Sequence, residues 1–257
     1  MILLLDIGNT RVKWAQLLEG ALTPQQSLLH RDVPVEEWTR QLFRERFRPQ
    51  RLLVANVAGA AMETTIRGEA QRLWQLTPEF AVSQAYACEV TNAYPQPTSL
   101  GVDRWLTLIA AHHLAPGWAC IIDAGTALTI DGLDAAGLHL GGLIIPGSRM
   151  MMDALLDGTG DIARKAREYS SVASGNIAEK GVFANDTARA VASGAFYALA
   201  AAADRAVVDL ARRAGGDAPR VYLTGGDAEQ LKRAMTSAAE IVPDLVLRGL
   251  AVTAGHA

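Results

Sequence analysis

The chain has 257 residues, of which half are apolar and a fifth charged, and its net charge at pH 7 is −3. This length accommodates one large domain or two smaller ones, since domains commonly contain about 100–200 residues. The absence of a lysine and arginine cluster disfavours nucleic-acid binding, because phosphate neutralisation requires clustered positive charge. Cys88 and Cys120 form no C-x-x-C pair and lie among apolar neighbours, so we expect buried thiols rather than a zinc site or a disulfide.

In the first half of the chain, short apolar runs bounded by turn residues alternate with segments of helical spacing. The opening run is too short for a signal peptide, because Asp6 ends it. Two prolines between Asn92 and Gly101 predict a loop. We expect strands at Ile2–Leu5, Val12–Leu18, Arg51–Val57 and Ala81–Val90, and helices at Val35–Phe47, Met62–Leu76 and Arg104–Leu114.

The second half repeats this alternation. The polar segment Asp157–Gly181 is rich in glycine and serine and predicts a loop. The uncharged stretch Ala190–Ala203 is shorter than the ~20 residues of a membrane span, so we predict a buried helix, no membrane segment and a cytoplasmic protein. We expect strands at Trp118–Ile122, Leu128–Leu133, Leu138–Ile144, Arg220–Leu223 and Glu240–Leu245, and helices at Arg149–Leu156, from about Asp186 to Ala214, and from Asp227 onward.

A repeated motif organises the sequence. Asp6-x-Gly8-x-Thr10 recurs as Asp123-x-Gly125-Thr126, and each copy follows one apolar strand and precedes another. Two copies this far apart are too few for a solenoid. We therefore predict two similar α/β domains, 1–115 and 116–257, with a cleft between them.

The residues of the first copy fit the binding of nucleotide phosphates. Glycine lets backbone N–H groups approach an anion closely, and Asn9 and Thr10 add side-chain donors. An ionised Asp6 only accepts hydrogen bonds, so we expect it to hold a hydrated Mg²⁺, while Lys13 adds positive charge. One such turn alone is also typical of a structural hairpin. The second copy favours the nucleotide site, although the chain lacks both the P-loop sequence and Gly-x-Gly-x-x-Gly.

Two further segments have candidate functions. In Gly101-Val102-Asp103-Arg104, a carboxylate that can accept a hydroxyl proton adjoins a guanidinium that can bind an anionic substrate. The alternative is that Asp103 merely caps a helix. Thr224-Gly225-Gly226-Asp227 either packs against an adenine ring or simply begins a helix.

In order and spacing, these segments resemble the type III pantothenate kinases, a family of the acetate and sugar kinase, heat-shock ATPase and actin superfamily. The resemblance rests on Asp6–Thr10, Gly101–Arg104, Asp123–Thr126 and Thr224–Gly226. It implies two ribonuclease-H-like domains, a homodimer, and ATP-dependent phosphorylation of pantothenate to 4′-phosphopantothenate, the first step of coenzyme A biosynthesis.

The resemblance also implies roles for individual residues. Asp103 would be the general base, and Asp123 would bind an activating monovalent cation, K⁺ or NH₄⁺. Thr187 would reach the substrate from the partner subunit, although many relatives have Asn-Thr where this chain has Asn185-Asp186-Thr187. Pantothenate would contact Tyr94, Gly101, Val102, Asp103, Arg104 and Thr187. ATP would contact Asp6, Ile7, Gly8, Asn9, Thr10, Arg11, Val12, Lys13 and Thr126.

Two other interpretations of the residues stay open. One is a kinase for another small hydroxylated acid or a sugar, but many such kinases are longer or carry a zinc-binding Cys/His cluster that this chain lacks. The other is a nucleotide-binding regulatory or accessory protein without turnover, in which Asp103 would be dispensable.

Overall fold

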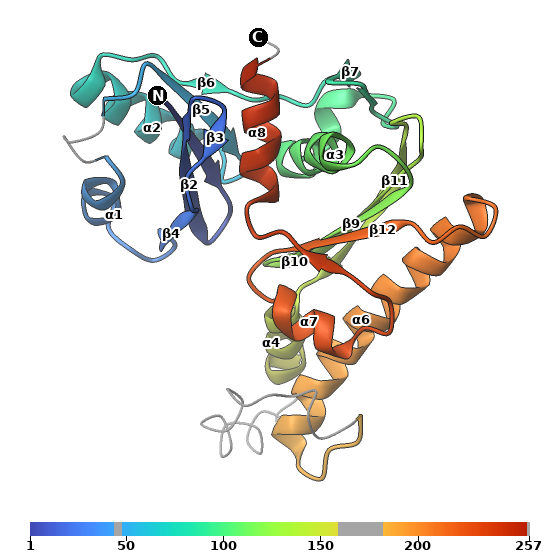
Figure 1. The fold of residues 1–257 in the computed structure, drawn as a ribbon. Helices are drawn as coiled ribbons and strands as arrows, with labels where there is room; N and C mark the ends of the chain where they lie inside the picture. Colours follow the sequence, from blue (N-terminus) through green and yellow to red (C-terminus); the bar gives the residue numbers. More distant parts are fainter. Residues whose placement is uncertain (44–47, 159–181, 256–257) are drawn as a thin grey trace. The chain divides into compact units, whose positions relative to one another are not determined.

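The computed structural model describes residues 1–43, 48–158 and 182–255 (Figure 1). The chain forms two compact units. The first contains Met1–Pro116, Ala136–His139 and Asp244–Ala257, and the second contains Gly117–Ala135 and Leu140–Pro243. The domain boundary between residues 115 and 116 stays a prediction.

The first unit is built on a six-stranded sheet. Its order is β3-β2-β1-β5-β6, and β4 also pairs with β2. β1 is antiparallel to β2 and parallel to β5, so β1 and β5 end at the same edge. The strands are β1 (Ile2–Ile7), β2 (Arg11–Leu18), β3 (Ala21–Leu22), β4 (Gln26–Leu29), β5 (Arg51–Asn56) and β6 (Glu79–Phe80).

Alternation along β1 divides the core of this unit between the two faces of the sheet. Leu3, Leu5 and Ile7 pack with α1 (Val35–Leu42) and α2 (Ala60–Trp74). Leu4 packs with α3 (Val102–Leu114) and α8 (Leu245–Gly255), which lie side by side in Figure 1. Because side chains alternate along a strand, Asp6 is on the same face as Leu4. The carboxylate therefore belongs to the face that α3 covers.

The second unit has a five-stranded sheet of order β11-β10-β9-β12-β13. One face packs against the long helix α6 and the short helix α7, and α4 lies against α6. The strands are β9 (Ala119–Ala124), β10 (Ala127–Leu133), β11 (His139–Pro146), β12 (Arg220–Thr224) and β13 (Glu240–Ile241). The helices are α4 (Ser148–Gly158), α6 (Thr187–Arg213) and α7 (Ala228–Ala234).

The predicted repeat is confirmed in the strand connections. In each unit the first strand pairs antiparallel with the second and parallel with a later strand, and a further parallel strand follows. Asp6 and Asp123 occupy the same position on their first strands, opposite Lys13 and Thr129 respectively. The predicted α/β fold with two related halves is therefore correct.

Two predicted elements are wrong. Ala81–Val90 is no strand: β7 (Tyr86–Ala87) and β8 (Val90–Thr91) form a small hairpin whose turn residues, Cys88 and Glu89, both have positive φ. The predicted strand Glu240–Leu245 ends at Ile241, because Pro243 cannot continue the ladder, and the unpredicted helix α8 begins at Leu245.

Three other expectations need adjustment. The helix predicted over Val35–Phe47 ends at Leu42, with residues 44–47 outside the described part. Most of the predicted loop Asp157–Gly181 is also outside it. Cys120 is buried as expected, whereas Cys88 is half-buried.

Helix α6 is long and apolar enough to cross a membrane, but 39% of its apolar window is buried within the structure. The core helix of a soluble protein passes the same test of length and composition. The buried residues of α6 pack on β9, β10 and α7, as the predicted buried helix requires.

Candidate functional site

The first Asp-x-Gly loop joins β1 to β2 at the carboxyl end of β1. The Gly8 backbone N–H donates to the Arg11 carbonyl over 3.0 Å, which closes the turn. His30 Nε2 donates to the Gly8 carbonyl over 2.7 Å. Nothing in the local sequence around His30 indicated this contact, because His30 directly follows β4 and lies outside the motif. Two hydrogen bonds to the Gly8 backbone therefore fix the loop, while the side chains of Asn9 and Arg11 are exposed.

Asp6 lies at the end of β1 and is 7% exposed. Its Oδ2 atom lies 3.9 Å from Lys13 Nζ, at the limit of an ion pair. The two residues face each other in the β1–β2 register. The Asp6 carboxylate and the Lys13 ammonium group therefore lie together beside a turn that contains the exposed Asn9. In contrast, the Ile7 and Val12 side chains are fully buried in the core, so only their backbone atoms can meet a ligand.

The second predicted segment begins α3. Gly101 is the N-cap and has no side-chain capping bond, so Asp103 is not the cap but lies in the first turn. Asp103 Oδ1 accepts a hydrogen bond from the Arg104 backbone N–H over 2.8 Å. A Cβ at Gly101 would stand 2.6 Å from that Oδ1 atom. A side chain there would displace the carboxylate, which explains the glycine, while the helix N-terminus favours the negative charge of Asp103.

Arg104 and Tyr94 form a contact that their spacing in the sequence did not reveal. Arg104 is 5% exposed and donates from Nη1 to the Tyr94 hydroxyl over 3.0 Å. The hydroxyl oxygen accepts this bond, so the hydrogen of Tyr94 remains available for another acceptor. Tyr94 and Arg104, both expected to contact pantothenate, are thus hydrogen-bonded to each other.

A pocket of about 340 Å³ adjoins this segment. Gly101 and Val102 form part of its wall, and so does Asn56, which ends β5 opposite Ile7 of β1. The pocket therefore lies at the carboxyl edge of β1 and β5, where the Asp6 loop also begins. Its polar lining comes from Asn56, Glu63, Ser83, Thr98 and Ser99.

The second Asp-x-Gly loop joins β9 to β10 in the other unit. The Gly125 backbone N–H donates to the Ala127 carbonyl over 3.1 Å, so this turn is one residue shorter than the first. Asp123 is partly exposed at the end of β9, and Thr126 is exposed at the turn. Both predicted residues of this loop are therefore accessible.

Two glycines pack tightly around this loop. A Cβ at Gly225 would stand 2.4 Å from the Ala124 carbonyl and 2.5 Å from Asp123 Oδ1. A Cβ at Gly147 would stand 2.4 Å from the Thr126 carbonyl oxygen. Gly225 has φ +97°, which itself favours glycine. The predicted Thr224–Gly226 segment is thus brought directly against the Asp123 loop.

Ser148 also lies at this loop and was not assigned from the sequence, whereas Asp227 belongs to the predicted turn that begins at Thr224. Ser148 Oγ donates to Asp227 Oδ2 over 2.5 Å, and the Asp227 backbone N–H donates to the Ala124 carbonyl over 3.0 Å. The only local signal was the Pro146-Gly147 break before Ser148. The pair ties the start of α4 to the start of α7.

Thr187 is the first residue of α6. The Asp186 side chain caps this helix by accepting from the Arg189 backbone N–H over 2.9 Å, as the predicted helix start requires. The preceding Val182 and Phe183 are 57% and 95% exposed. Two exposed apolar side chains therefore precede Thr187 closely in the sequence.

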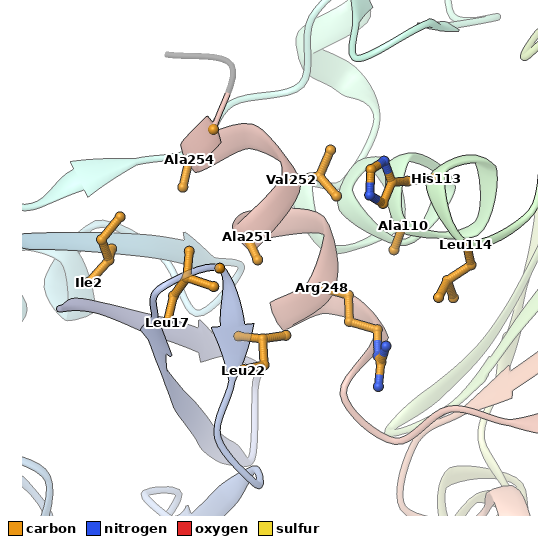
Figure 2. Close-up of a pocket in the computed structure, with 12 residues that line it drawn as sticks. Ile2, Leu17, Leu22, Ala110, His113, Leu114, Arg248, Ala251, Val252 and Ala254 are labelled. Atoms are coloured by element: carbon orange, nitrogen blue, oxygen red, sulfur yellow. The ribbon is translucent and has the colours of Figure 1, made fainter.

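A second pocket of the first unit, of about 590 Å³, is mainly apolar (Figure 2). Ile2, Leu17 and Leu22 line one part, and Arg248 of α8 and His113 of α3 also line it. Among the described residues that line it, none was predicted to bind substrate or ATP. Ile2 pairs with Leu17 at the amino end of β1, so this pocket lies at the sheet edge opposite Asp6.

Comparisons with known proteins agree with the motifs. Residues 2–209 match the family model described as type III pantothenate kinase. The type III pantothenate kinase of Nitrosococcus oceani is 38% identical over 258 residues, covering 98% of this chain and 92% of that relative.

Two solved structures share the fold at low sequence identity. The ethanolamine utilization protein EutJ from Carboxydothermus hydrogenoformans matches with a TM-score of 0.55 and 14% identity, covering 97% of this chain and 88% of that one. A ROK family glucokinase from Streptomyces griseus, in complex with glucose and AMPPNP, matches with a TM-score of 0.51 and 13% identity, covering 100% and 99%. They place the chain in the actin-like ATPase fold, and the sequence matches show that it belongs to the type III pantothenate kinase family.

Proposed function

We propose that this protein transfers the γ-phosphoryl group of ATP to the primary hydroxyl of pantothenate, with Asp103 as general base. The observation that carries the proposal is the position of Asp103 in a chain of this family. It lies in the first turn of α3, which begins at the carboxyl edge of the β1–β5 sheet beside a polar pocket.

In the proposed reaction, the hydroxyl oxygen of pantothenate attacks the γ-phosphorus of ATP. The bond to the β–γ bridging oxygen breaks, ADP leaves, and the hydroxyl proton passes to the Asp103 carboxylate. A carboxylate suits this step because it orients the hydroxyl as well as accepting its proton. Asp103 is partly exposed, so a substrate can reach it.

Tyr94 and Arg104 bind the acceptor in this proposal. Arg104 supplies a buried positive charge that complements the pantothenate carboxylate. Because the Tyr94 oxygen already accepts from Arg104, its hydrogen can be donated to a carbonyl or carboxylate oxygen of the substrate. Gly101 and Val102 contribute the adjoining wall.

The proposed ATP contacts come from the two Asp-x-Gly loops, through Asp6–Lys13 and Thr126. The exposed backbone of the first loop fits phosphate oxygens. Asp6 fits a Mg²⁺ that keeps its water ligands, since it offers one carboxylate at the strand end. The metal would neutralise charge on the phosphates, and Asp6 would orient its water shell.

Asp123 is proposed to hold a monovalent cation. Its Oδ1 atom faces a space that a Cβ at Gly225 would fill. The carbonyl oxygens of Ala124, Gly125 and Thr126 border the same glycines. Carboxylate and carbonyl oxygens are suitable donors for K⁺. The bound cation would add positive charge beside the loop.

We also propose a homodimer in the cytoplasm, with Thr187 contributing to the partner's acceptor site. The consecutive Val182 and Phe183 are 57% and 95% exposed, and they support an interface near Thr187 because adjoining exposed apolar side chains mark interaction surfaces. Phe183→Ser should shift the mass measured by light scattering toward that of one chain. Val35→Ser, on an exposed position of α1, is the control and should leave the mass unchanged.

The central experiment measures ADP release with ATP, Mg²⁺, K⁺ and pantothenate. Asp103→Asn should reduce kcat by roughly 10²–10⁴ while ATP binding stays near normal. The matched control is Asp217→Asn, which removes an exposed carboxylate and should retain full activity. Full activity of Asp103→Asn would remove the residue from the proposed role. Loss of activity when Na⁺ replaces K⁺ is expected from the cation site, and indifference would count against Asp123.

The same assay separates the two alternatives. Phosphorylation of glucose or N-acetylglucosamine without turnover of pantothenate would support a sugar kinase. ATP binding without turnover of any acceptor would support the regulatory protein.

A further inference from the structure

The link between β10 and β11 packs within the first unit, although both strands belong mainly to the second. The part that packs there is Ala136–His139, which comprises the end of the link and the first residue of β11. The Gly137 carbonyl accepts a hydrogen bond from the Thr91 backbone N–H over 2.9 Å, and Leu138 forms a parallel bridge with Thr91. The segment is therefore fastened to β8, a few residues before Tyr94.

Gly137 makes this attachment possible. Its φ is +80°, and a Cβ there would stand 2.3 Å from the Glu89 carbonyl oxygen. Glu89 and Cys88 form the tight β7–β8 turn and have φ of 64° and 49°, which non-glycine residues rarely adopt. Strained residues of this kind persist only where the surroundings fix them. The turn and the segment thus hold each other in place.

His139 extends from this segment to the ring of Tyr94. It is 1% exposed, and the two rings are stacked with centroids 5.9 Å apart and planes at 13°. The Tyr94 hydroxyl in turn accepts the hydrogen bond from Arg104, whose guanidinium carbon lies 5.8 Å from the Tyr94 ring centroid. A continuous contact therefore runs from His139 through Tyr94 to Arg104.

We infer that His139 is a positioning residue for the acceptor site, acting through Tyr94. Its flat ring fixes the plane of the Tyr94 ring, and this aims the hydroxyl at Arg104 and its remaining hydrogen at the acceptor. Since a phenol ring without a stacked neighbour samples more orientations, losing the stack weakens acceptor binding but leaves the phosphoryl-transfer step intact. This inference rests on the proposed function, which assigns Tyr94 and Arg104 to pantothenate.

The test replaces His139 by two residues that fill its space differently. His139→Leu keeps most of the volume but removes the flat ring, and His139→Phe keeps the ring. His139→Leu should raise the KM for pantothenate roughly 3- to 10-fold, the usual scale for an aromatic pair, with kcat and the KM for ATP within twofold of wild type. His139→Phe should restore the KM to within about twofold. Melting temperatures verify that both variants are folded.

A double-mutant cycle separates positioning from general support of the fold. In a Tyr94→Ala background, His139→Leu should have no further effect on the KM for pantothenate, because its effect passes through the tyrosine ring. Equal effects in both backgrounds, failure of His139→Phe to restore the KM, or a parallel rise in the KM for ATP would overturn the inference. If the wild type phosphorylates pantothenate while His139→Leu is unchanged, only the inference fails. If the wild type does not phosphorylate it, the proposed function fails as well.

Discussion

The packing of α8 against α3 depends on Gly249. A Cβ at this position would stand 2.1 Å from the Leu106 carbonyl oxygen and 2.7 Å from its carbonyl carbon. Real Cβ atoms almost never approach another atom within 3.0 Å. Gly249→Ala therefore requires α8 and α3 to separate by roughly 1 Å, since the obstacle is backbone and cannot rotate away.

The expected cost follows from the contacts that this separation loosens. Val246, Leu247 and Leu250 of α8 are buried with Leu106 and with Leu4 of the sheet. Inserting a methyl group into such a core costs about 1–3 kcal/mol, whereas replacing glycine by alanine in a helix gains up to about 1 kcal/mol. We expect a net loss of about 1–2 kcal/mol, which lowers the melting temperature by roughly 2–8 °C for a protein of this size.

Thermal unfolding followed by circular dichroism measures this effect, and Gly68→Ala is the matched control. Gly68 is exposed in α2, and nothing lies within 4 Å of a Cβ there. The same substitution should stabilise the protein at position 68 by about 0.5–1 kcal/mol, because only helix propensity changes. Because α3 also carries Asp103, Gly249→Ala should raise the KM for pantothenate. A Gly249→Ala variant as stable as wild type would refute the packing argument.

Three further predictions concern the second unit. Burial raises the pKa of the Cys120 thiol to about 12, so iodoacetamide at pH 8 should label it only in denaturant, as mass spectrometry can show. Burial alone would raise the pKa of Asp204, but the hydrogen bonds that it accepts outweigh burial and lower it. Its stabilising contribution is therefore present above the unfolded pKa of about 3.9 and is lost as the pH falls through the lower folded value. Asp204→Asn should lower the melting temperature at pH 7, and this effect should shrink as the pH is lowered below the unfolded pKa. Gly225→Ala should weaken binding of an ATP analogue in calorimetry, because its Cβ would meet the Ala124 backbone, whereas Gly226→Ala has free space and should bind normally.

The repeated framework could be predicted because its signals are local. An apolar run that ends in Asp-x-Gly shows both the buried strand and the turn that follows it, and two copies show the duplication. The start of α6 could be predicted for the same reason, because Asp186 caps the helix through a residue only three positions later. The family motif at Gly101–Arg104 is likewise contiguous.

The contacts that organise the candidate site could not be predicted, because they join residues far apart in the sequence. His30, directly after β4, donates to the Gly8 carbonyl, and Ser148 at the start of α4 donates to Asp227 before α7. The pair formed by Tyr94 and His139 depends on where the β10–β11 link lies. None of these residues belongs to a periodic pattern that indicates its partner, so only the folded chain reveals them.

Helix α8 shows how local preference and packing compete. Its sequence contains Gly249 and several β-branched residues, which have low helix propensity. The sequence pattern therefore predicts a strand ending at Leu245 and no helix after it. Yet Val246, Leu247, Leu250 and Ala254 follow helical spacing and are all buried on one side. The glycine that weakens the local signal is the residue that lets α8 approach the backbone of α3. Burial of this face therefore outweighs propensity, and the helix that carries Asp103 is packed against α8.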